Sequence, residues 1–143
     1  MLIGEYNHAV DIKGRLFVPA KFREDLGEKF IVTCETGYCL SAYSPSEWTQ
    51  FSEKLRRLPR TDEAVQAFLR QFSSLACECE PDKQGRILLP SNLREIIGLD
   101  DEAVLIGKID IMEIWPPKKW KAYREKTATG YEQTLKKLAE MGI

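Results

Sequence analysis

Short apolar runs separated by Gly, Pro and Asp recur through the first third of the chain and predict a series of short strands. Segments 6–10 and 15–18 are apolar and rich in β-prone side chains. Between them, Asp11 offers a carboxylate that caps a tight turn, and Gly14 accepts the positive φ that such a turn requires. We therefore expect a hairpin here, followed by strands over 30–34 and 40–43.

Apolar residues three and four positions apart predict helices in other parts of the chain. A short helix follows Pro19 over residues 20–26 and ends at Gly27, which suits a C-terminal cap. Residues 44–47 form a capping box that opens a longer helix, and Pro59 ends it. Thr61 opens the next helix. The apolar faces of these two helices consist of Trp48, Phe51, Leu55 and Leu58, and of Val65, Phe68, Leu69 and Phe72. Such stripes are typical of core or subunit-contact surface.

The chain repeats itself at an offset of 71 positions, and this is its most informative feature. The match includes an Asp, a Gly, an Arg, three apolar residues and a Pro, and it extends into the following helix. The residues that coincide are Asp11, Gly14, Arg15, Pro19, Arg23 and Gly27 in the first copy, and Asp82, Gly85, Arg86, Pro90, Arg94 and Gly98 in the second. Two copies of one small unit are expected to bury their apolar faces against each other.

The second copy predicts the same elements in the same order. We expect a strand near 75–80, a turn at 82–85, a strand, a helix over 91–97, and strands near Val104 and at 111–115. Trp120 and Tyr123 begin a further helix, and residues 129–132 are expected to cap a last one that carries Leu135 and Leu138. This divides the chain into a first repeat (5–47), a helical connection (48–75), a second repeat (76–119) and C-terminal helices (120–143).

Composition limits the classes of function. The formal net charge of −1 and a pI near 5.9 give no overall attraction to nucleic acid. Positive side chains are nevertheless clustered, at Lys13 with Arg15, Lys21 with Arg23, 54–60 and 118–126. No apolar run is long enough to span a membrane, and the start of the chain is not that of a signal peptide, so a cytoplasmic protein without a membrane partner is expected.

The hairpin pattern Asp-x-x-x-Arg, followed by apolar residues, Pro and a short helix, resembles the AbrB and SpoVT superfamily of DNA-binding domains. Two copies in one chain of 143 residues resemble the MraZ family. The resemblance implies an α+β fold, a double swapped-hairpin AbrB-like β-barrel made by two pseudo-symmetric repeats, with peripheral helices. It further implies a nucleoid-associated transcriptional repressor that forms a ring-shaped homo-oligomer, such as an octamer. Such a regulator binds direct repeats in the promoter of a division and cell-wall gene cluster.

The resemblance assigns DNA binding to the hairpin tips and their surroundings, namely Lys13, Arg15, Lys21, Lys83 and Arg86. The turns themselves are shaped by Asp11, Gly14, Asp82 and Gly85. Two interpretations of each hairpin arginine stay open: an ion pair with the aspartate four residues earlier, or a contact to phosphate or guanine. Because Gln84 stands where the first copy has Lys13, the N-terminal hairpin is expected to bind DNA more strongly.

Other chemistry finds little support in the sequence. No motif of an enzyme is present, and no cofactor or small-molecule substrate is expected. Cys77 and Cys79 would point to one face of a strand, but the spacing of the four cysteines is not that of a standard zinc site, so reduced structural thiols are favoured. The single histidine, His8, is expected to pack or hydrogen-bond beside the hairpin. The acidic composition keeps one rival function open, an oligomeric scaffold that does not bind DNA.

Overall fold

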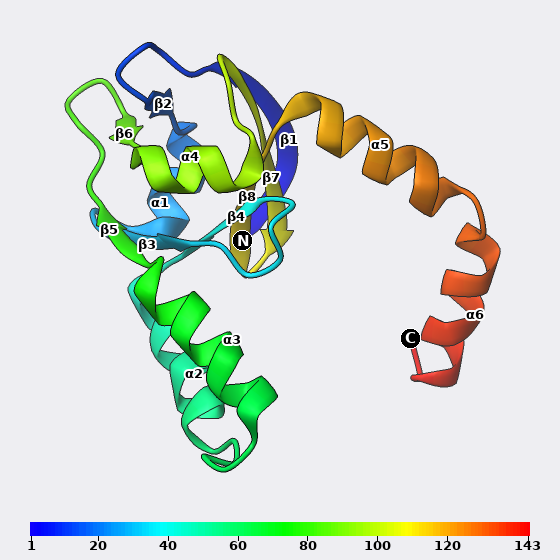
Figure 1. Ribbon diagram of the computed structural model, residues 1–143. Coiled ribbons are helices and arrows are strands. Elements are labelled where there is room, and N and C mark those ends of the chain that lie inside the picture. The colour runs from blue at the N-terminus through cyan, green and yellow to red at the C-terminus, as the bar shows by residue number, and fades with distance from the viewer.

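The computed structural model describes all 143 residues and has a mixed α+β fold (Figure 1). The first half of the chain, with the first repeat and the helical connection, contributes β1 (Leu2–Ala9), β2 (Arg15–Phe17), α1 (Ala20–Leu26), β3 (Phe30–Thr33), β4 (Leu40–Tyr43), α2 (Pro45–Arg56) and α3 (Glu63–Ser74). The second half, with the second repeat and the C-terminal helices, contributes β5 (Cys77–Cys79), β6 (Arg86–Leu88), α4 (Ser91–Ile97), β7 (Glu102–Ile109), β8 (Ile111–Trp115), α5 (Pro117–Ala128) and α6 (Tyr131–Glu140). The predicted order of elements is therefore confirmed in both copies, although the first strand begins earlier, at Leu2.

Strands of one repeat pair with strands of the other. An antiparallel sheet has the order β1-β7-β8-β4-β3-β5, and β2 pairs with β6 in a separate two-stranded ribbon. This order reads the same when the two repeats are exchanged. The pairs Ser41 with Glu113 and Leu16 with Ile87 lie at the centre of this approximate internal two-fold symmetry.

The hairpin predicted between segments 6–10 and 15–18 needs correction. Its turn forms, but its two arms separate, because β1 pairs along its length with β7 and β2 pairs with β6. Only Val10 and Leu16 bridge the two arms. The large sheet ends at β1 and β5, so the closed barrel implied by the family resemblance is not detected. The apolar pattern of a short strand identifies its buried face but carries no information about its partner.

One core of 21 buried residues holds the sheet, the ribbon and the two short helices together. Leu16 and Ile87 of the ribbon are fully buried, and α1 and α4 add Phe22 and Leu93 from equivalent positions. Burying side chains of this size contributes about 1.5–3 kcal/mol each. The ribbon is therefore fixed to the body through one face, and its opposite face is left toward solvent.

Two helical projections leave this body (Figure 1). The helices α2 and α3 pack against each other around Phe72, whereas α5 and α6 form an arm that extends away. The cap of α3 is Asp62 rather than Thr61, since the Asp62 carboxylate accepts the N–H groups of Ala64 and Val65. The cap expected for α6 is absent: Gly130 precedes this helix without a side-chain hydrogen bond. No helix in the chain combines the length and the apolar character needed to cross a membrane.

Candidate nucleic-acid interface

The ribbon formed by β2 and β6 presents both hairpin arginines on one face. Along each strand the side chains alternate, so that Leu16 and Ile87 point inward while Arg15 and Arg86 point outward. Arg15 lies opposite Leu88, and Arg86 is two residues from Leu88 on the same strand. Diagonal neighbours of this kind have Cα atoms about 7–8 Å apart. The two arginines therefore form one outward-facing pair.

An aspartate organises the turn before each arginine. The Asp11 Oδ1 atom accepts the backbone N–H groups of Lys13 and Arg15 at 3.0 and 2.9 Å, and Oδ2 accepts Arg15 Nε at 2.6 Å. The second copy repeats this arrangement, and Asp82 Oδ2 accepts Arg86 Nε at 3.1 Å. The backbone N–H of the arginine is the main cause that lowers the pKa of each aspartate below its ordinary value.

Both interpretations of the hairpin arginines are compatible with this geometry. The ion pair within the hairpin forms, and because both side chains are partly open to solvent, water screens it and its contribution to stability is small. Only Nε of each guanidinium is engaged with the protein. The two terminal nitrogens of Arg15 and of Arg86 keep the planar fork that binds phosphate or a guanine edge.

Arg23 and Arg94 hold the backbone of the hairpins through hydrogen bonds and contacts with the turns, a role that was not predicted from the sequence. Arg23 Nε donates to the Val18 carbonyl at 2.8 Å, and Arg94 Nε donates to the Leu89 carbonyl at 3.0 Å. Each guanidinium also lies against the turn glycine of the opposite repeat: Arg94 against Gly14, and Arg23 against Gly85. The signal in the sequence that points to these two arginines is their recurrence at equivalent positions of the repeat.

The turn glycines adopt the left-handed region, with φ of 87° at Gly14 and 82° at Gly85. The three predicted lysines are all exposed: Lys13 and Lys83 lie on the turns, and Lys21 lies in the first turn of α1. No protein group pairs with these lysines, so their charges are available to solvent.

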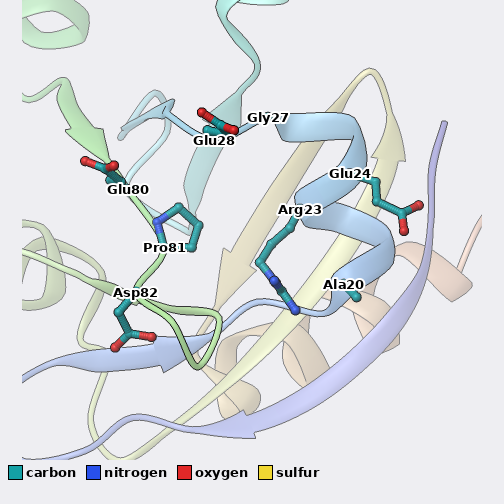
Figure 2. Close-up of a pocket in the computed structure, with 8 residues that line it drawn as sticks. All are labelled: Ala20, Arg23, Glu24, Gly27, Glu28, Glu80, Pro81 and Asp82. Carbon is teal, nitrogen blue, oxygen red and sulfur yellow. The ribbon is translucent and has the colours of Figure 1, made fainter.

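The surroundings of the two hairpins differ in charge. A hollow of about 580 Å³ lies beside the second hairpin, and Figure 2 shows the residues that line it, which include Arg23 and four carboxylates. These carboxylates belong to Glu24, Glu28, Glu80 and Asp82. At the equivalent positions of the first hairpin, Ala9 replaces Glu80 and Leu99 replaces Glu28. The first hairpin therefore has fewer negative charges near it that would repel a phosphate.

Comparison with known proteins identifies the family. The model described as "MraZ protein, putative antitoxin-like" matches the chain twice, at residues 1–71 and 72–141. The chain belongs to the MraZ family. Proteins named "Transcriptional regulator MraZ" from Caldicellulosiruptor saccharolyticus and Alkaliphilus oremlandii are each 50% identical over 143 residues, which cover the whole of both chains. The protein of that name from Carboxydothermus hydrogenoformans is 46% identical over 98% of both chains. The family resemblance inferred from the repeated hairpin is thereby confirmed.

The histidine and the cysteines complete the inventory of reactive side chains. His8 packs against the Phe17 ring at 5.0 Å, which confirms its predicted place beside the hairpin. All four cysteines are free, and the Sγ atoms of Cys77 and Cys79 are 3.9 Å apart. A hydrogen bond from Cys79 lowers the pKa of Cys77 to about 7, whereas burial raises the pKa of Cys39 to about 12. No three His, Cys, Asp or Glu side chains come together as a metal-binding group.

Proposed function

We propose that this MraZ-family chain is a sequence-specific DNA-binding transcriptional regulator. It binds direct repeats in a promoter, most often represses the division and cell-wall gene cluster behind that promoter, and is associated with the nucleoid in the cytoplasm. The observation that carries the proposal is the pair Arg15 and Arg86, which share the outward face of the ribbon with their terminal nitrogens free. The names of its relatives support transcriptional regulation.

The arginines and the lysines of each hairpin have different roles in this proposal. Arg15 and Arg86 contact base edges or phosphates, and Lys13, Lys83 and Lys21 contact phosphates. The repeats 5–47 and 76–119 supply the two equivalent hairpins that single-repeat relatives obtain by dimerisation. The exchange of strands between repeats supports an arrangement of the AbrB swapped-hairpin type. Asp11 and Asp82, with the turn glycines, hold each guanidinium outward.

Self-association completes the proposed function. With a net charge of −1, one chain offers only a small basic surface, so its affinity for DNA is limited. A ring-shaped homo-oligomer presents many copies of that surface to consecutive direct repeats, and linked sites raise the overall affinity without a new contact. DNA with several repeats in phase is therefore expected to bind far more tightly than DNA with one.

Promoter binding by the variants Arg15→Ala and Arg86→Ala tests the proposal. Arg15→Ala is expected to weaken binding by about 1–3 kcal/mol for each arginine–base pairing that it removes, while the fold and assembly remain. Arg86→Ala is expected to be milder, because more carboxylates lie beside its hairpin than beside the first one. Arg70→Ala on α3 is the control that removes the same charge far from the ribbon. Wild-type affinity in Arg15→Ala would refute the assignment of the N-terminal hairpin.

The acidic composition and the acidic hollow favour one second candidate, a self-assembling scaffold without DNA binding. A salt titration with a promoter fragment separates the two functions. DNA binding predicts an affinity that falls steeply as salt rises, because bound counterions are released from the phosphates. A scaffold predicts an assembled protein that forms no complex with the fragment at any salt concentration.

A further inference from the structure

The C-terminal arm leaves an apolar stripe of α6 without a partner. All residues from Lys121 onward are exposed, and Figure 1 shows α6 separated from the body. Tyr131, Leu135 and Leu138 recur at helical spacing on one side of α6, and Leu135 is 48% exposed. Apolar stripes of amphipathic helices in soluble proteins are normally covered. We therefore expect another protein surface to cover this face of α6.

The internal repeat shows what an equivalent helix does. By its place in the first copy, α3 is the counterpart of α6, and each follows a helix that opens with Pro. Phe72 of α3 inserts among the aromatic residues of α2: its ring stacks on Trp48 at 4.8 Å and meets Phe51 edge-on at 5.4 Å. The function of α3 in the first repeat is thus to close an aromatic surface.

The counterpart of that aromatic surface is open in the second repeat. Trp115, Trp120 and Tyr123 repeat Tyr43, Trp48 and Phe51 at an offset of 72 positions, but no aromatic ring of α6 stacks on them and every residue of α6 is exposed. Tyr38 stacks parallel to Trp115 at 6.3 Å, and between α5 and the loop of Tyr38 lies a groove of about 720 Å³. Its principal lining residues are Tyr38, Trp115, Lys119, Ala122, Tyr123 and Lys126. This groove offers the kind of surface that α3 covers in the first repeat.

The connection within the arm works against closure of the groove by the same chain. Only Thr129 and Gly130 separate α5 from α6, whereas residues 57–62 separate α2 from α3. Antiparallel packed helices are joined by loops of about 2–5 residues, so the connection between α5 and α6 is at the short limit of this range. Gly130 instead has φ of 84° and turns the chain so that α6 points away. The arm is therefore arranged to reach another molecule.

We propose that the apolar face of α6 in one copy of this chain docks in the groove formed by Tyr38, Trp115 and Tyr123 of a second copy. The inference rests on the self-association in the proposed function and names its contact surfaces. Each copy would bind one neighbour through its α6 helix and the other neighbour through its groove, so the contact joins two different surfaces and is head-to-tail. Contacts of this class close into rings when the rotation between subunits permits closure.

Paired charge substitutions in the full chain test this contact. The double variant Leu135→Asp with Leu138→Asp is expected to raise the concentration at which the assembly dissociates by at least about tenfold, because the proposed contact would then bury two carboxylates in place of two leucines. The control is Gln133→Asp with Lys136→Gln, which makes the same change of −2 in charge on the opposite side of α6. Light scattering reports the mass, and far-ultraviolet circular dichroism reports whether α6 stays folded.

Cross-linking then identifies the occupant of the groove. A photoreactive phenylalanine analogue is placed at Leu135, and copies carrying two different mass tags are mixed before illumination. Cross-links from Leu135 to Tyr38 or to the 119–126 segment of a differently tagged copy support the proposal. Cross-links to the groove of the same copy, or to another surface, overturn it. A wild-type protein that is monomeric at micromolar concentration would refute self-association itself, whereas an assembly that survives both leucine substitutions would refute only the contact between arm and groove.

Discussion

Replacement of Gly14 by Ala measures how far the first hairpin depends on the second repeat. A Cβ atom at Gly14 would lie 2.7 Å from Arg94 Nε, well inside the contact distance of real side chains. Arg94 must therefore move, and its hydrogen bond to the Leu89 carbonyl at 3.0 Å is broken or lengthened. The free energy of unfolding falls by about 0.5–1.5 kcal/mol for the hydrogen bond. The φ of 87° adds about 1–2 kcal/mol for a residue with a side chain.

The chain offers a matched control for the backbone contribution. Gly37 has φ of 84°, but no atom lies within 4 Å of the position of its Cβ. Gly37→Ala therefore loses only the backbone contribution of about 1–2 kcal/mol. Urea unfolding followed by tryptophan fluorescence gives both values, provided that protein concentration is held constant because the protein is proposed to assemble.

A double variant isolates the contact with Arg94. If the two side chains collide, then Arg94→Ala removes the collision, and Gly14→Ala costs about 1 kcal/mol less in that background. Equal unfolding free energies for Gly14→Ala and Gly37→Ala would refute the reasoning, as would strict additivity in the double variant. Promoter binding by Gly14→Ala is expected to weaken too, since the same movement displaces the turn that carries Lys13 and Arg15.

Three further predictions concern charge and reactivity. Lys13→Ala is expected to lower affinity for all DNA sequences and to reduce the salt slope by about one unit, so an unchanged slope would show that Lys13 makes no phosphate contact. Iodoacetamide is expected to label Cys77 first, at a rate that rises as pH passes about 7. Cys39, with a pKa of about 12, is expected to be labelled only after unfolding. Mass spectrometry of the labelled protein measures the order, and labelling of Cys39 before Cys77 would contradict this prediction. The lowered pKa values of Asp11 and Asp82 mean that their contribution to stability is present above the unfolded pKa, near 3.8, and is lost as pH falls through the folded pKa. Acid unfolding of Asp11→Asn with Asp82→Asn is therefore expected to lose less stability between about pH 5 and 2 than wild type, and identical acid profiles would count against these hydrogen bonds.

Local chemistry allowed much of this protein to be predicted from its sequence. The helices after Pro19 and Pro90 were placed correctly because a favourable start, an apolar spacing and a terminal glycine all act within a few residues. The family followed from one repeated hairpin, since the combination of Asp, Gly, Arg and Pro is specific when it occurs twice at one offset.

Long-range contacts decided the rest. The alternation of side chains along a strand shows which face is buried, but the pairing of β2 with β6 depends on the folding of both repeats around one core. The role of Arg94 depends on its approach to Gly14 from the opposite repeat, at a distance of 80 positions in the sequence, which no local pattern encodes. The apolar spacing of α6 was visible in the sequence, but the sequence did not show whether this stripe is covered. In the tertiary structure the chain turns away at Gly130, and this leaves both the stripe on α6 and the groove beside Trp115 uncovered.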